Sequence, residues 1–206
     1  MAGERLRIGV LALQGDFHLH GKALERCGAQ GVEVRKPEEL DGLDGLIVPG
    51  GESTTLLKLM DEWDFLPALR KFHASGRPIF GTCAGLILLA SEVQSPHQVS
   101  LGFIDATVER NAYGRQRESF EEQGEVALDG RRVAVEMVYI RAPRIRRVGP
   151  GVEVLAARDG EPVMAREGTV LVAAFHPELT DDSTVHRYFC EMVAATRHQN
   201  DHGRQA

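Results

Sequence analysis

The chain has 206 residues, of which 43% are hydrophobic and 26% charged, and its formal net charge is −6. This length suits one domain with a sizeable core. The negative charge argues against nucleic acid or an anionic membrane as the main partner. No apolar run approaches the roughly 18 residues of a membrane span.

The N-terminus lacks the basic, apolar and cleavage regions of a signal peptide, so we expect a cytoplasmic protein. The chain has three cysteines, Cys27, Cys83 and Cys190, which lie far apart and without C-x-x-C spacing. They predict neither a disulfide framework nor a zinc site.

The first half of the chain alternates short apolar runs with amphipathic segments. The apolar runs read as buried parallel strands, because helices cover both faces of such strands. Alternation of this kind is typical of an open, doubly wound α/β sheet, whose sites lie beyond the carboxyl ends of the strands. The predicted strands cover residues 7–13, 32–34, 45–49 and 78–82, and the predicted helices 17–27, 54–60 and 65–72, with Ser53 as a candidate N-cap.

The second half predicts strands separated by short turns, two of which are the Asp-Gly pairs at 129–130 and 159–160. We expect these strands to form antiparallel hairpins added to the sheet. A last buried strand and a closing helix follow them. The strands cover 101–108, 133–140, 152–156, 162–165 and 169–175, and the helix about 182–196. One domain should span 1–197, followed by a polar tail at 198–206 that we expect to be disordered.

The segment Gly81-Thr82-Cys83-Ala84-Gly85 stands between an apolar run and a helix-forming run. A Gly-x-nucleophile-x-Gly pattern in this position is a nucleophile elbow, in which the glycines leave room for a sharp turn. The helix N-terminus favours the thiolate, which is the nucleophilic form of cysteine. The alternative is a buried structural cysteine flanked by packing glycines.

A nucleophilic thiol needs a base, and the base needs an orienting partner. His176 and Glu178 follow the last buried strand, so the imidazole can emerge at the same sheet edge as Cys83. Residues two apart in extended chain point the same way, which lets Glu178 face His176. The alternative is a turn with a solvated charge.

Acyl chemistry also needs backbone N–H donors for the oxyanion. One candidate is Ala84, the residue after the nucleophile. The other is the Gly50-Gly51 loop, where the backbone can approach a ligand closely. The alternative, a phosphate loop, is disfavoured because Glu52 places an acid in it and the Walker lysine spacing is lacking.

Seven segments together resemble the glutaminase subunits of pyridoxal 5′-phosphate synthase, a family of class I (triad) glutamine amidotransferases. The likeness runs from about Ile8 to Met192, and a departure from the family pattern falls at Arg117-Glu118. The segments at 109–116 and 140–143 narrow the likeness from amidotransferases in general to vitamin B6 synthesis. The segments are Leu13-Gln14-Gly15, Pro49-Gly50-Gly51-Glu52-Ser53-Thr54, Gly81-Thr82-Cys83-Ala84-Gly85-Leu86, Glu109-Arg110-Asn111-Ala112-Tyr113-Gly114-Arg115-Gln116, Ser119-Phe120-Glu121, Ile140-Arg141-Ala142-Pro143 and Phe175-His176-Pro177-Glu178-Leu179.

The resemblance implies a three-layer, flavodoxin-like, mostly parallel sheet and the hydrolysis of L-glutamine to glutamate and ammonia. It implies that Cys83 is the nucleophile and that His176 and Glu178 form the charge relay. Gln14 resembles a residue near the synthase contact that helps to set the state of the glycine loop. The implied oxyanion donors are Gly51 and Ala84, and the implied glutamine-binding residues are Gly51, Glu52, Ser53, Arg110, Ile140 and Arg141.

By the same resemblance, the ammonia passes to a (β/α)8 synthase subunit in a large hetero-oligomer. That subunit makes pyridoxal 5′-phosphate from a pentose phosphate, a triose phosphate and ammonia. No cofactor or metal is implied for this chain. The rival readings are another class I amidotransferase, a γ-glutamyl hydrolase-like cysteine hydrolase, or a flavodoxin-like binding module whose triad does not work.

Two smaller signals remain. His18 and His20 do not share a helix face and have no third ligand nearby, which argues against a metal site. Arg144, Arg146 and Arg147 form a basic run that we read first as a solvated face and second as a contact for an acidic partner surface.

Overall fold

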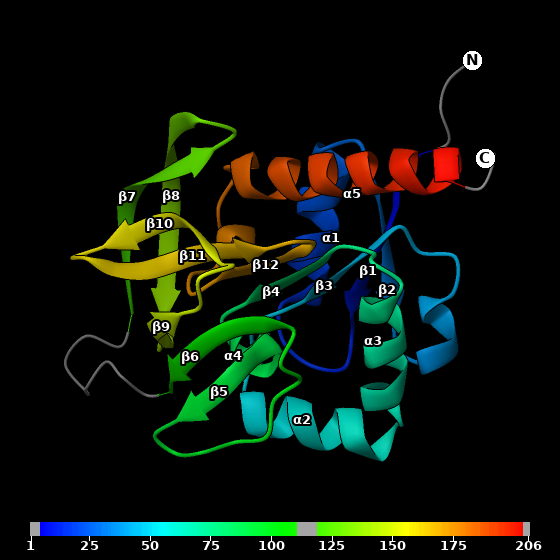
Figure 1. The fold of residues 1–206 in the computed structure, drawn as a ribbon, viewed down its shortest axis with the longest axis horizontal. Helices are drawn as coiled ribbons and strands as arrows, with labels where there is room; N and C mark the ends of the chain where they lie inside the picture. Colours follow the sequence, from blue (N-terminus) through cyan, green and yellow to red (C-terminus); the bar gives the residue numbers. More distant parts are fainter. Residues whose placement is uncertain (1–4, 111–118, 204–206) are drawn as a thin grey trace.

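The computed structural model describes residues 5–110 and 119–203, drawn in colour in Figure 1. Three expectations therefore lie outside the described residues: the family segment at 111–116, the departure at 117–118, and the last part of the polar tail. The single-domain boundary at 197 stays a prediction.

A large sheet forms the centre of the molecule (Figure 1). Within the described residues it has seven strands in the order β10-β11-β12-β4-β3-β1-β2. The neighbours from β12 to β2 pair in parallel, as the apolar runs predict, whereas β10 and β11 pair antiparallel. The strands are β1 (Arg7–Leu11), β2 (Gln30–Val34), β3 (Gly45–Val48), β4 (Ile79–Thr82), β10 (Glu153–Arg158), β11 (Glu161–Glu167) and β12 (Val170–Ala173).

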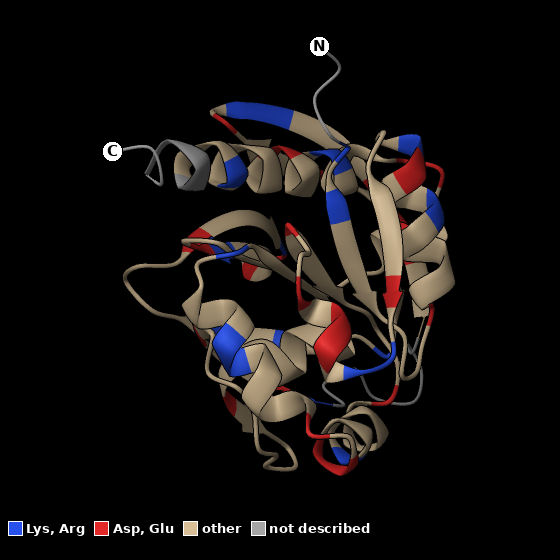
Figure 2. Ribbon diagram, turned by 90° about the vertical axis from the view of Figure 1, so that its right-hand side faces the viewer, with Lys and Arg blue, Asp and Glu red and all other residues tan. Residues whose placement is uncertain are grey.

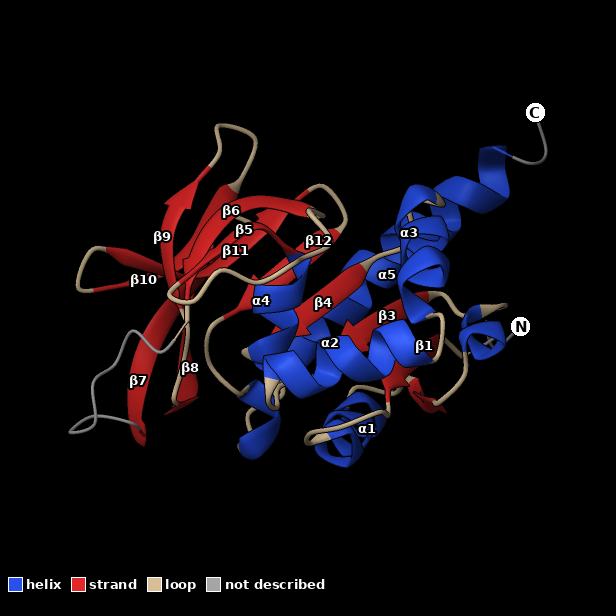
Figure 3. Cartoon of the chain, turned by 90° about the horizontal axis from the view of Figure 1, so that it is seen from below, coloured by secondary structure: helices blue, strands red, loops and turns tan. Residues whose placement is uncertain are grey.

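Helices cover both faces of this sheet, and the alternation of side chains along β4 shows which helix lies on which face. Phe80 packs against Phe189 of α5, whereas a Cβ on the next residue, Gly81, would lie 2.7 Å from the carbonyl carbon of Gly85 in α4. α1 lies with α5, and α2 and α3 lie with α4 (Figure 1; Figure 3 gives the view from below). The helices are α1 (Phe17–Arg26), α2 (Ser53–Glu62), α3 (Phe65–Ala74), α4 (Ala84–Leu89) and α5 (Thr184–Gly203), with short 3-10 turns η1 (Pro37–Leu40) and η2 (Pro177–Leu179).

The second half of the chain forms two further sheets, which corrects one prediction. The segments at 101–108 and 133–140 do not join the central sheet; of the predicted added strands, only β10 and β11 do. The reason is pairing, since β6 pairs with β5 and β9, and β8 pairs along its whole length with β7. These strands are β5 (Ala90–Gln94), β6 (Ile104–Glu109), β7 (Ser119–Leu128), β8 (Arg131–Ile140) and β9 (Arg144–Val148).

The two Asp-Gly turns are where the sequence predicts them. Asp129 and Gly130 have φ of 48° and 77°, and Asp159 and Gly160 have φ of 50° and 81°. Two successive residues with positive φ are the mark of a type I′ turn, which matches the twist of the flanking strands. They close the β7–β8 and β10–β11 hairpins.

Two helix ends differ from the sequence-based expectation. The carboxylate of Glu52, not Ser53, caps α2, because it accepts hydrogen bonds from the N–H groups of Thr54 and Thr55. α5 continues to Gly203, so the first part of the tail that we expected to be disordered is helical. No helix among residues 5–110 and 119–203 is long and apolar enough to cross a membrane.

Basic and acidic residues lie interspersed along the ribbon (Figure 2). The arginines of β9 follow this pattern, because Arg144 pairs with Glu161, Arg146 with both Glu109 and Glu161, and Arg147 with Asp105. The basic run is thus matched by carboxylates of the same chain.

Candidate active site

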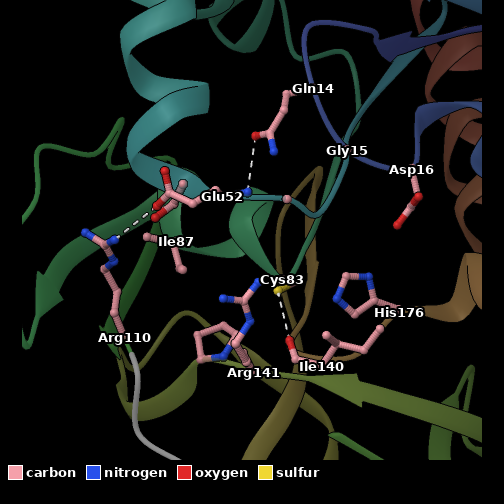
Figure 4. Close-up of a pocket in the computed structure, with 13 residues that line it drawn as sticks. Gln14, Gly15, Asp16, Glu52, Cys83, Ile87, Arg110, Ile140, Arg141 and His176 are labelled. Carbon is pink, nitrogen blue, oxygen red and sulfur yellow. Dashed lines mark hydrogen bonds and ion pairs between the residues drawn. The ribbon is translucent and has the colours of Figure 1, made fainter. Parts of the chain in front are cut away.

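The pairing of β4 with β12 brings the predicted nucleophile and base together. Thr82 is in register with Ala173, and the Cys83 N–H donates to the Ala173 carbonyl at 2.9 Å. The chain therefore leaves both strands at the same edge, and the imidazole of His176 and the thiol of Cys83 line the same cavity. In Figure 4 both side chains face the same pocket.

Cys83 occupies a strained turn, as an elbow requires. Its φ of 47° and ψ of −101° are unusual for a residue with a side chain, and such strain is typical of functional positions. Gly85 is indispensable for the turn, because a Cβ there would lie 2.0 Å from the carbonyl oxygen of Val48. The sulfur lies 4.0 Å from the carbonyl oxygen of Ile140. The thiol is 6% exposed yet lines the pocket, so the structure favours the elbow over a merely structural cysteine.

Glu178 orients His176 from the side away from the pocket. The imidazole Nδ1 lies 2.8 Å from Glu178 Oε1, and the two residues are 5% and 3% exposed. Burial lowers the pKa of His176, but the neighbouring Cys83 and the hydrogen-bonded Glu178 outweigh burial and raise this pKa to about 10. Burial likewise raises the pKa of Glu178, but the neighbouring His20 and His176 lower it to about 2. The carboxylate is therefore a buried charge with partners, not a solvated turn.

The Gly50-Gly51 loop lies directly against this pair. A Cβ on Gly50 would lie 2.4 Å from His176 Cε1 and 3.4 Å from Cys83 Cβ. Gly51 has a φ of 147°, which disfavours any residue with a side chain. Ala84, the other predicted oxyanion donor, is the first residue of α4, where backbone N–H groups have no partner within the helix. Both peptide groups are thus adjacent to the nucleophile in sequence or in space.

A cavity of about 370 Å³ opens in front of Cys83, within the size range usual for small-ligand sites. It lies where the loops after β1 and β3 meet, at the point where the strand order of the sheet reverses. All the predicted glutamine-binding residues line it. The lining residues are Gln14, Gly15, Asp16, Gly51, Glu52, Ser53, Cys83, Ile87, Arg110, Ile140, Arg141, Pro143 and His176.

Arg110 and Glu52 form the charged end of the pocket (Figure 4). Arg110 Nη2 donates to Thr54 Oγ1 at 3.0 Å and lies 3.6 Å from Glu52 Oε1. Burial raises the pKa of Glu52, but hydrogen bonds from Thr55 and Thr54 lower it to about 2. The Arg110 side chain is 13% exposed. Its guanidinium therefore lies in the wall of the pocket, where it can face an anionic group of a ligand.

Gln14, Arg141 and Ser53 complete the pocket. Gln14 Oε1 accepts a hydrogen bond from the N–H of Glu52 at 3.1 Å and touches Gly51, which links the β1 loop to the glycine loop. Arg141 has a φ of 44°, a left-handed conformation that is uncommon for arginine. Ser53 Oγ donates to Oε1 of the buried Gln98 at 3.1 Å.

Sequence reasoning missed several residues of this region. Asp16, Ile87 and Pro143 line the pocket, and only the nearness of Asp16 to Gln14 could have indicated one of them. His20 and His186 lie behind Glu178, and no spacing in the sequence links them. Among the described side chains, no three His, Cys, Asp or Glu residues come together as metal ligands would.

Comparison with known proteins gives the family. Residues 10–195 match the SNO glutamine amidotransferase family. The chain is 57% identical over 188 residues to a protein of Koribacter versatilis (strain Ellin345) named pyridoxal 5′-phosphate synthase subunit PdxT, covering 91% of this chain and 96% of that protein. It is 50% identical over 192 residues to the protein of the same name from Niallia circulans, covering 93% and 100%.

Solved structures agree with these sequences. A crystal structure described as a glutamine amidotransferase aligns with a TM-score of 0.85 and 53% identity, over 91% of this chain and 98% of that one. The structure of PurLQS from Thermotoga maritima shares the fold, with a TM-score of 0.71 at 15% identity, over 94% and 99%. The family match, these identities and the shared fold show that the chain belongs to the SNO glutamine amidotransferase family.

Proposed function

We propose that this enzyme, a glutamine amidotransferase by family, hydrolyses L-glutamine to glutamate and ammonia at Cys83, as the glutaminase subunit of a pyridoxal 5′-phosphate synthase. One observation carries the proposal. Cys83 and His176, whose Nδ1 lies 2.8 Å from Glu178 Oε1, line one cavity together with every residue that the resemblance assigns to glutamine. The names of the relatives supply the pathway.

In the first half of the reaction, the Cys83 thiolate attacks the carbon of the side-chain carboxamide. The oxygen gains negative charge, which the N–H groups of Gly51 and Ala84 stabilise, as backbone donors aimed at a developing charge do. His176, protonated through its partnership with Cys83 and Glu178, gives its proton to the departing nitrogen. The products of this half are ammonia and a thioester on Cys83.

In the second half, neutral His176 takes a proton from water, which attacks the thioester carbon. The C–S bond breaks, glutamate leaves and the thiolate is restored with His176 protonated. Glu178 accepts the Nδ1–H of His176 throughout, which leaves Nε2 free to face the reacting atoms. The negative charge of Glu178 stabilises the imidazolium each time it forms.

The charged end of the pocket suits the amino-acid end of glutamine. Arg110 can pair with the α-carboxylate, and Glu52 carries the negative charge that suits the α-ammonium group. Ile140 and Arg141 contribute backbone groups on the opposite wall, with the Ile140 carbonyl already close to Cys83. This division lets the carboxamide reach the sulfur while the charged end stays at Arg110.

Ammonia produced in water is protonated and loses its nucleophilicity, so a separate acceptor protein has to receive it. We propose that a (β/α)8 synthase subunit does so within a large hetero-oligomer, and that this chain needs no cofactor of its own. The cytoplasmic location expected from the sequence stays a prediction.

The test is the release of ammonia from glutamine by the purified chain, with and without the synthase subunit. The wild-type protein should release ammonia and glutamate in equal amounts, and Cys83→Ala should release none. Preference for γ-glutamyl peptides over glutamine would favour a γ-glutamyl hydrolase. Absence of turnover even with the synthase would favour an inactive binding module.

The same assay tests whether the partner activates the enzyme. The Gly50-Gly51 loop depends on glycine backbone and on one hydrogen bond to Gln14, so we expect the isolated subunit to be slow and the synthase to accelerate it. Equal rates in both conditions would rule out activation while leaving the hydrolytic reaction intact.

A further inference from the structure

Behind the triad, on the side of β4 that faces α1 and α5, lies a group of buried polar side chains. His20 comes from α1, Thr82 from β4 and His186 from α5, and all three are 0% exposed. Burying polar side chains costs free energy unless they are hydrogen-bonded, so the burial of these three residues together calls for a functional explanation. Of these three residues, His20 contacts the carboxylate of Glu178, and Thr82 and His186 contact His20.

The contacts form a line that ends at the triad. His20 Nδ1 lies 3.0 Å from His186 Nε2, and His20 Nε2 lies 3.2 Å from Thr82 Oγ1 and 3.4 Å from Glu178 Oε2. The other oxygen of the same carboxylate, Oε1, lies 2.8 Å from His176 Nδ1. Glu178 is therefore contacted on one oxygen by the catalytic base and on the other by His20.

The protonation of this line follows from its burial. Burial lowers the pKa of His20, and it lowers the pKa of His186 to about 3, so both rings are neutral near neutral pH. A neutral imidazole has one N–H, and a carboxylate oxygen can only accept. We therefore assign the proton of His20 to Nε2, where it is donated to Thr82 Oγ1. Glu178 Oε2, 3.4 Å from the same nitrogen, has no hydrogen-bond partner among the described residues, so it interacts with this N–H electrostatically. His20 Nδ1 accepts the Nε2–H of His186.

His186 fits this assignment. Among the described residues, its Nδ1 has no hydrogen-bond partner. With the proton on Nε2, the unpartnered atom is an acceptor and not a donor, which is the less costly of the two to leave unpaired because no N–H is stranded. His186 thereby fixes which nitrogen of His20 is protonated.

We propose that His20 is a positioning residue for glutamine hydrolysis: its Nε2–H, in the tautomer that His186 fixes, lies 3.4 Å from the otherwise unpartnered second oxygen of Glu178 and stabilises the carboxylate electrostatically, so that the first oxygen aims His176 at Cys83. The inference rests on the proposed function, because it assumes that Cys83, His176 and Glu178 catalyse the reaction. His20 is absent from the residues that line the pocket, so it acts on the rate through Glu178 and not through contact with glutamine.

The proposal has a pH signature. Glu178 is buried, and burial by itself raises the pKa of its carboxyl. Replacing the His20 ring, whose Nε2–H lies 3.4 Å from Oε2, removes electrostatic stabilisation of the carboxylate and therefore raises this pKa. Glu178 then becomes protonated, and stops orienting His176, at a higher pH than in the wild-type protein. The ionisable groups around this carboxyl are His176 on its own segment, Cys83 after β4, His20 on α1 and His186 on α5, with Asp16 and Arg26 acting on the two histidines from farther away.

The experiment compares His20→Leu with His20→Gln, each assembled with the synthase subunit. His20→Leu keeps an apolar volume but no donor, so we expect kcat to fall by about 10- to 100-fold, as when an orienting partner behind a reactive group is lost. KM for glutamine should stay within about 2-fold, because the pocket is untouched, and the acid limb of the kcat profile should move to higher pH. His20→Gln places an amide N–H near the former Nε2. It should restore most of kcat and return the acid limb of the kcat profile to its wild-type pH.

A matched control separates positioning from packing. Leu24→Ala alters the same helix at another fully buried residue and should lower stability without moving the acid limb. The proposal is overturned if His20→Leu keeps the wild-type kcat and the wild-type pH of the acid limb. It is also overturned if folded His20→Gln has a kcat as low as that of His20→Leu. Activity in Cys83→Ala would instead overturn the proposed function.

His186→Leu tests the line from its far end and serves if His20→Leu does not fold. It removes the donor to His20 Nδ1, so that His20 can carry its proton on either nitrogen. We expect kcat to fall by less than in His20→Leu, and the acid limb of the kcat profile to move in the same direction. A readout without turnover is the rate at which iodoacetamide alkylates Cys83, followed on its peptide by mass spectrometry. Alkylation at mildly acidic pH should slow in both leucine variants; an unchanged rate and limb would overturn the proposal.

Discussion

The pocket joins two regions that are built differently. On one side, the ends of the parallel strands β4 and β12 present Cys83 and His176, which are 6% and 5% exposed and fixed by backbone hydrogen bonds to neighbouring strands. On the other side, Glu52 and Arg110 come from the start of α2 and the residue after β6, and the Glu52 side chain is 48% exposed.

The difference separates two tasks. A reaction needs geometry that does not change when substrate arrives, and a closely packed sheet edge provides it. Binding a charged substrate needs groups that can exchange partners, and the Arg110–Glu52 pair, close to water, can be rearranged around the charged end of glutamine. Substitutions on the sheet side should therefore lower kcat, and those on the other side should raise KM.

The largest effect is expected for Cys83→Ala, which removes the proposed nucleophile. We expect the rate of ammonia release to fall by at least about 10⁴-fold, while glutamine still binds when measured by calorimetry, because the pocket walls remain. Cys190→Ala is the matched control, since Cys190 is a buried thiol on α5 outside the pocket. Equal losses in both variants would remove the nucleophile assignment.

Glu178→Gln should follow, with a fall in kcat of about 10³- to 10⁴-fold and little change in KM. The amide keeps the shape of the carboxylate but loses the charge that stabilises the imidazolium of His176. Steady-state kinetics in the complex with the synthase measure both constants. A rise in KM at constant kcat would place Glu178 on the binding side of the comparison.

The same variant should behave differently in acid. The pKa of Glu178 is about 2 in the folded protein and about 4.3 in an unfolded chain. The carboxylate therefore stabilises the fold above the unfolded value, and this stabilisation is lost as pH falls through the folded one. The difference in Tm between wild-type protein and Glu178→Gln should narrow over this range; a constant difference would contradict the assignment.

On the binding side, Arg110→Ala should raise KM for glutamine by about 10- to 100-fold, the range of a lost charge-assisted hydrogen bond, and leave kcat nearly unchanged. Arg132→Ala is the control, because Arg132 pairs with Glu125 at 3.2 Å on the exposed β7–β8 hairpin. If Arg110→Ala lowers kcat as strongly as Glu178→Gln, the separation of the two tasks fails.

The smallest effect is expected for Gln14→Ala, at the junction of the two regions. It removes one neutral hydrogen bond, to the N–H of Glu52, so the synthase-stimulated rate should fall by about 2- to 10-fold. Gln94→Ala removes a hydrogen bond of similar length to Glu92 on the exposed β5 and should have no effect. No difference between the two variants would show that Gln14 does not support the glycine loop.

The sequence predicts the sheet side better than the binding side, for a physical reason. Strands buried on both faces must be almost entirely apolar, so β1, β3, β4 and β12 are recognisable from short runs. The elbow and the His-x-Glu pair are local patterns at the ends of such strands. Their meeting needs only that β4 and β12 be neighbours.

The strands of the second half are harder to recognise. β7 alternates exposed and half-buried residues and contains three glutamate or glutamine side chains in succession, from Glu121 to Gln123, and β9 is mostly arginine. Their partners are fixed by tertiary pairing and not by their own composition. For this reason the sequence predicts β8 as a strand but assigns it to the wrong sheet.

The contacts behind the triad could not be predicted at all. His20 and His186 are separated by 166 residues, and each alone reads as a polar residue on a helix. The cap of α2 shows the same limit on a smaller scale, because Ser53 is the better N-cap by residue type, yet Glu52 reaches the free N–H groups.

The insertion of β12 next to β4 also governs the order in which the protein can become active during translation. The elbow leaves the ribosome with the first half of the sheet, whereas the strand that positions the imidazole, and the α5 helix that seals the histidines behind it, are synthesised much later. A nascent chain thus holds a cysteine without its base, and it cannot release ammonia before its last strand pairs and its last helix docks.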